Sequence, residues 1–167
     1  MLYKVIKGCV ALVLGGSVFG LLALAVHTGS PMTLRHSVSF YYYIYILGEP
    51  GALVPPGTIM IAVFTIFSVM AAALMVILGV LMLSGFRPWK IERVFFIGMI
   101  IAGGVVLVTG LIGIIEALTQ EGLGEELQPS VGIGGILLAT IGGTCIIFAF
   151  ISKFVLRKKI KDEDIGF

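Results

Sequence analysis

Four long runs of apolar residues dominate the chain, and short stretches rich in polar residues, glycine and proline separate them. A helix that crosses the hydrocarbon core of a membrane needs about 20 consecutive, mainly apolar residues. The segments that meet this requirement are residues 5–26, 59–83, 94–118 and 131–155. The pattern therefore predicts an all-α membrane protein in which four transmembrane helices form an antiparallel bundle.

The composition points the same way. Apolar residues make up 59% of the 167 residues and charged residues 12%. In a soluble domain, about 45–50% of the residues are apolar and about 25% are charged. A soluble fold of this length cannot bury so much apolar surface, so we expect residues 1–167 to form a single integral membrane domain. With a small net charge of +2, the expected partners are the lipid bilayer and other membrane subunits rather than nucleic acid.

Lysine and arginine are distributed very unevenly along the chain. All of them except Arg35 lie in the N-terminal segment, between the second and third spans, or from Lys153 to the end of the chain. The positive-inside rule places such segments in the cytoplasm. We therefore expect both termini, including the tail 156–167, on the cytoplasmic side of the plasma membrane. Trp89 is expected to anchor the chain at the inner headgroups.

The segment that joins the first two spans, residues 27–58, is long and carries a run of tyrosines. Its aromatic and β-branched residues favour a strand. One interpretation is an interfacial segment at the outer headgroups. Another is an ordered strand or short helix that docks a partner, and a third is a re-entrant segment. The tyrosines concerned are Tyr41, Tyr42, Tyr43 and Tyr45.

Glycine is frequent within the predicted spans, and the chain contains 23 glycines. Glycine is common in membrane helices, but small residues also let helix backbones approach closely where lipid gives no hydrophobic drive for association. We expect such packing here, either within one chain or between chains. The glycines assigned to it are Gly16, Gly20, Gly103, Gly104, Gly135 and Gly142.

Residues typical of catalytic and metal sites are sparse. A haem held between helices needs two facing histidines at membrane depth, yet His27 ends the first span and His36 follows in the outer segment. We expect no cofactor, no metal and no catalytic residue. Glu116, near the outer end of the third span, either reaches outer water or another helix, or forms a polar site with His27.

Three functions are compatible with the sequence. The leading hypothesis is a non-catalytic scaffold or accessory subunit of a larger membrane complex, which packs through glycine-rich helix faces and presents the tyrosine run to a partner. The first alternative is a small channel or transporter subunit whose pore forms on oligomerisation. The second is a membrane enzyme of lipid or quinone chemistry at the outer interface, using His27, Arg35, His36 and Glu116.

Overall fold

Four long helices form the body of the protein in the computed structural model, which describes residues 2–29, 36–48, 56–84, 88–119, 130–131 and 133–163. All four contain a segment that is long and apolar enough to cross a membrane. The chain is therefore an integral, multi-pass membrane protein, and the prediction of four spanning helices is confirmed. The helices are α1 (Leu2–Leu22), α3 (Pro56–Leu83), α4 (Pro88–Thr119) and α5 (Ile133–Glu163).

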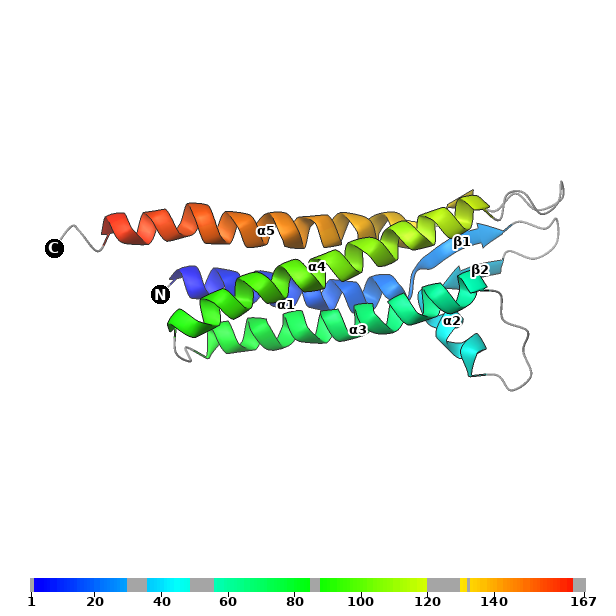
Figure 1. Ribbon diagram of the computed structural model, residues 1–167, viewed down its shortest axis with the longest axis horizontal. Helices are drawn as coiled ribbons and strands as arrows, with labels where there is room; N and C mark the ends of the chain where they lie inside the picture. Colours follow the sequence, from blue (N-terminus) through cyan, green and yellow to red (C-terminus); the bar gives the residue numbers. More distant parts are fainter. Residues whose placement is uncertain are drawn as a thin grey trace.

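The helices lie side by side and alternate in direction along the chain (Figure 1). Helix α1 packs along α3, α3 along α4, and α4 along α5, while α1 and α5 meet more sparsely. The beginning of α1, the end of α3, the beginning of α4 and the last turns of α5 lie at one end of the bundle (Figure 1). We call this end the N-terminal end, and the other the sheet end.

Apolar side chains fill the centre of the bundle. Met75 and Leu78 from α3 pack there with Met99 from α4 and with Leu138 and Cys145 from α5. The Cys145 thiol lies 3.6 Å from the Met75 sulfur. The outward surface of the helices is also apolar, as lipid requires of a spanning segment.

A hydroxyl pair joins α3 to α4 inside the bundle. The oxygens of Ser68 and Thr109 lie 2.7 Å apart, and Thr109 Oγ1 also lies 2.9 Å from the carbonyl oxygen of Val105. Ser68 can thus donate to Thr109, while Thr109 donates to the carbonyl oxygen of Val105 in its own helix or to that of Phe64 in α3, which lies 3.1 Å away. By contrast, Thr140 and Thr144 are exposed on α5 and bond only to carbonyls one turn earlier, which satisfies each hydroxyl against lipid.

A small antiparallel sheet and a short helix complete the sheet end. Strand β1 (Ala25–Gly29) lies between β2 (His36–Ser39) and β3 (Ser130–Val131). The sheet ties the segment after α1 to the segment before α5, so the two ends of the bundle differ in architecture (Figure 1). The predicted all-α class therefore holds for the spanning part, with these three strands added.

The tyrosine run is largely helical. Of the strand and the short helix that were expected as alternatives for it, the structure has the short helix beyond Ser39, against the local preference for a strand. Residues Phe40–Leu47 form helix α2, which contacts α3. Propensity for strand depends strongly on context. A helix bonds its own backbone groups, which suits a segment beside lipid, whereas an unpaired strand edge is costly there.

Candidate functional site

The outward face of α1 carries two glycines, Gly16 and Gly20, that have open space over them. A Cβ atom at Gly16 or Gly20 would have no neighbour within 4 Å outside its own helix. Cys9 and Val13 precede them at spacings of four and three residues, which places all four residues on one side of the helix. All four are exposed, Val13 to 67%. We call Cys9, Val13, Gly16 and Gly20 the outer α1 face.

The opposite side of α1 packs tightly against α3. A Cβ atom on Gly8 would lie 2.9 Å from the carbonyl oxygen of Gly79, and one on Gly15 would lie 2.9 Å from that of Ala72. Ala11 between them is fully buried. Helix α1 thus has small residues on two sides, and among the described residues only one of those sides contacts another helix.

Glycines also line the contact between α4 and α5. A Cβ atom on Gly103 would lie 2.8 Å from the Cβ of Cys145, and one on Gly142 would overlap the backbone of Leu107. Gly135 lies in the same contact, facing Gly110 and Ile114. The helices approach this closely only because these positions lack side chains.

Gly104 differs from its neighbour Gly103. It lies on the other side of α4, where a Cβ atom would meet no described neighbour within 4 Å. Of the six glycines that the sequence assigned to packing, Gly103, Gly135 and Gly142 therefore lie between helices of this chain. Gly16, Gly20 and Gly104 face outward, and contacts with other chains stay a prediction for them.

Helix α2 is pinned beside the end of α1. The Phe40 side chain is fully buried. The Tyr41 hydroxyl donates a hydrogen bond of 3.2 Å to the carbonyl oxygen of Phe19 in α1. Tyr45, one turn further on, is 64% exposed. An exposed aromatic surface therefore lies close to the outer α1 face, while the side chains of Tyr42 and Tyr43 lie outside the described part of the structure.

The possible polar site of His27 and Glu116 stays a prediction, because the structure shows only that the elements carrying the two residues contact each other. His27 lies in the central strand β1, opposite Val38 and Val131, and β1 contacts α4. Glu116 lies half-buried in the last turn of α4. The His27 side chain is outside the described set, as are the side chains of His36 and Trp89 and the whole of Arg35.

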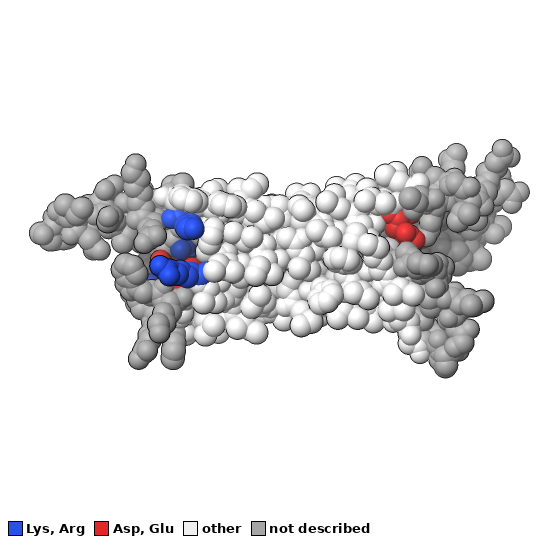
Figure 2. Space-filling view, in the orientation of Figure 1, with Lys and Arg blue, Asp and Glu red and all other residues white. Residues whose placement is uncertain are grey.

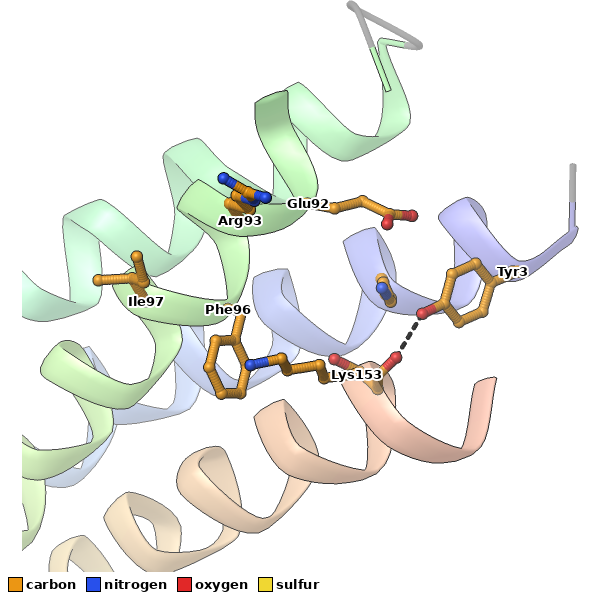
Figure 3. A pocket seen from close by; sticks show the side chains of 8 residues that line it. Tyr3, Glu92, Arg93, Phe96, Ile97 and Lys153 are labelled. Atoms are coloured by element: carbon orange, nitrogen blue, oxygen red, sulfur yellow. Dashed lines mark hydrogen bonds between the residues drawn. The ribbon is translucent and has the colours of Figure 1, made fainter. Parts of the chain in front are cut away.

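A pocket at the N-terminal end was missed by the sequence analysis. It has a volume of about 400 Å³ and lies between α1, α4 and α5. Figure 3 shows Glu92 and Arg93 on α4, with Tyr3 and Lys153 on the helices opposite. The lining residues are Tyr3, Lys7, Glu92, Arg93, Phe96, Ile97, Ser152 and Lys153. Their separation in the sequence explains the omission, since only packing brings the three helices together.

Lys7 is the most unusual residue of this pocket, because its side chain is 3% exposed. Its ammonium lies 4.0 Å from the centre of the Tyr3 ring and 5.7 Å from that of Phe95. From the sequence, Lys7 is one of the basic residues of the N-terminal segment that are expected on the cytoplasmic side. In the structure it turns inward over the aromatic rings instead of extending to the surface.

The two ends of the bundle also differ in charge. In the part of the chain whose side chains are described, the basic residues Lys4, Lys7, Arg93 and Lys153 all lie at the N-terminal end, and Glu92 lies among them. The other described carboxylate, Glu116, lies towards the sheet end. Figure 2 shows the wide uncharged band that separates these two groups. Among the described residues, no three His, Cys, Asp or Glu side chains cluster as metal ligands.

The chain matches no protein-family model, and neither a curated protein nor a solved structure shows significant similarity to it.

Proposed function

We propose that the protein is a non-catalytic accessory subunit of a membrane complex, which joins its partner through the outer α1 face. In lipid, two helices associate where small residues allow their backbones to approach. The same chemistry already operates twice inside this chain, between α1 and α3 and between α4 and α5. The outer α1 face offers a third surface of this kind.

The observation that carries the proposal is the open space over Gly16 and Gly20. A glycine within a helix lowers the stability of the helix by about 1 kcal/mol relative to alanine. At both positions the described chain leaves room for a side chain, so its own packing does not require glycine. A partner helix packed on this face would make use of both glycines. Val13 and Cys9 would extend the contact along the same side of α1.

Helix α2 supports the same side of the molecule. Its bond from Tyr41 to Phe19 fixes it next to the end of α1. Tyr45 and Leu47 are exposed there, to 64% and 38%. Tyrosine suits both the outer headgroups and protein interfaces. In the proposed complex α2 lies at the outer membrane surface and contacts the extracellular part of the partner.

The orientation belongs to the same proposal. We place the N-terminal end in the cytoplasm and the sheet end outside the plasma membrane, because the basic residues concentrate at the former. A membrane-impermeant thiol reagent tests this in intact cells, in a background without native cysteines. A cysteine at Ser37 is expected to react and one at Gly85 is not. The reverse labelling would overturn the orientation.

Native-gel mass in a mild detergent tests the assembly. A band that contains this chain together with a different membrane protein is the expected result. A defined assembly of this chain alone would replace the accessory role with a homo-oligomer, the arrangement required of a pore built by several copies. A monomer in every mild detergent, and after cross-linking in the membrane, would overturn the proposal.

A further inference from the structure

The pocket at the N-terminal end holds a buried positive charge, that of Lys7, which its surroundings compensate only in part. The Lys7 ammonium contacts the rings of Tyr3 and Phe95. The Glu92 carboxylate acts on it electrostatically, but among the described residues no carboxylate forms a direct ion pair with Lys7. Burying an ammonium group is costly unless a partner of opposite charge or several hydrogen bonds compensate for it. Two cation–π contacts replace only part of its hydration.

The pocket as a whole carries a net positive charge. Lys7, Arg93 and Lys153 line it against one carboxylate, that of Glu92, so positive charges exceed negative ones by two. Some polar groups of the lining are already engaged. The Tyr3 hydroxyl donates to the carbonyl oxygen of Ser152 over 2.5 Å, and the Ser152 hydroxyl donates to its own helix. The donors left for a ligand are therefore mainly the three cations.

We propose that this pocket binds the phosphate of an anionic phospholipid headgroup. Phosphate oxygens accept charge-assisted hydrogen bonds from lysine and arginine. Basic pockets between transmembrane helices are a known kind of site for anionic headgroups. The phosphate would approach the Lys7 ammonium, and Arg93 on α4 and Lys153 on α5 are the other cations of the lining that could bind it.

The apolar part of the pocket favours a lipid over free phosphate. Phe96 and Ile97 form one wall, and Ile97 is 55% exposed. Phe96 packs edge-on against Phe150, with ring centres 5.6 Å apart, and Phe150 is itself 46% exposed on α5. The charged pocket thus continues into an apolar outer surface, where the acyl chains of a bound lipid would lie. The volume of about 400 Å³ is in the range of small-molecule sites, which begins at about 300 Å³.

The test measures binding of phosphatidylglycerol to the full chain in detergent by native mass spectrometry. Phosphatidylcholine, which also carries a phosphate but has no net charge, is the reference lipid. Wild-type protein is expected to retain phosphatidylglycerol preferentially. The Lys7→Met variant is expected to weaken that binding about tenfold or more, as loss of a charge-assisted hydrogen bond does. Lys4→Met removes the same charge from the same helix outside the pocket and is expected to bind as wild type.

Several outcomes would overturn the site. Equal binding of phosphatidylcholine and phosphatidylglycerol would mean that the net charge of the lipid does not determine binding. Unchanged binding of phosphatidylglycerol by a folded Lys7→Met variant would mean that Lys7 does not contact the headgroup. If that variant does not fold, Arg93→Gln decides, because it changes an exposed pocket residue and is expected to lower the affinity as well. Inorganic phosphate that competes fully with the lipid would assign the site to a soluble anion instead. None of these results depends on the outer α1 face, so the two proposals fail separately.

Discussion

The contact between α4 and α5 and the outer face of α1 are built from the same residue type with opposite results. Between α4 and α5, the missing side chains of Gly103 and Gly142 are replaced by atoms of the facing helix. On α1, the space over Gly16 and Gly20 remains open within the described chain. The comparison shows that glycine spacing marks surfaces suited to close approach. Whether a surface is used inside the chain depends on how the other helices pack.

Gly142→Leu is expected to have the largest effect, because a side chain there must displace the backbone of Leu107. Overpacking in a core typically costs about 1–3 kcal/mol, and a clash with backbone belongs at the upper end. Thermal unfolding in detergent should show a clear loss of stability. The neighbouring Gly143→Leu is the control, since its Cβ would lie 3.7 Å from a movable methyl group of Leu107. Similar losses in both variants would mean that this contact is looser than described.

Lys7→Met is expected to have the next largest effect, and it should raise the stability of the protein rather than lower it. Lys7 lies on the inward side of α1, and its replacement by an apolar residue removes the cost of burying a charge that the Glu92 carboxylate compensates only in part. In lipid-free detergent the variant should unfold at a higher temperature than wild type. Lys4→Met, which removes a half-exposed lysine from the same helix, should change little. A destabilised but folded Lys7→Met variant would indicate that the lysine has a compensating partner already.

Thr109→Val probes a contact between helices that does not depend on glycine. The change removes the hydrogen bond between Ser68 and Thr109 and the contact of the Thr109 hydroxyl with the Phe64 carbonyl oxygen of α3. Such bonds between membrane helices contribute about 0.6 kcal/mol on average, so a small loss of unfolding free energy is expected. Thr140→Val removes a hydroxyl that bonds only to its own helix and should cost less. If Thr140→Val costs as much, the Ser68–Thr109 pair makes no specific contribution to α3–α4 packing.

Tyr41→Phe is expected to have the smallest effect. It removes the hydrogen bond to the Phe19 carbonyl oxygen at a partly exposed position. A neutral hydrogen bond contributes about 0.5–1.5 kcal/mol, and exposure to water reduces that figure. Hydrogen exchange of α2 should rise while global unfolding stays unchanged. Unchanged exchange would show that the buried Phe40 alone holds α2 in place.

The spanning helices were predictable because the requirement for about 20 apolar residues acts on each segment separately. Features that depend on packing were not predictable in this way. The pocket joins Tyr3, Glu92 and Lys153 across most of the chain, and no local pattern links them. The helical state of Phe40–Leu47 contradicts its local strand preference. The direction in which Gly103 and Gly104 face likewise follows from the placement of α5.

The role of the outer α1 face in assembly is tested most directly by measuring both association and stability in one variant of this face. The free energy of unfolding of the Gly16→Leu and Gly20→Leu double variant should lie within about 0.5 kcal/mol of that of wild type, because both new side chains enter open space. In the same membranes, cross-linking of the chain to its partner should be lost. Thr144→Leu, on the exposed face of α5, should preserve it. Full cross-linking in the folded double variant would contradict a role for the outer α1 face in assembly.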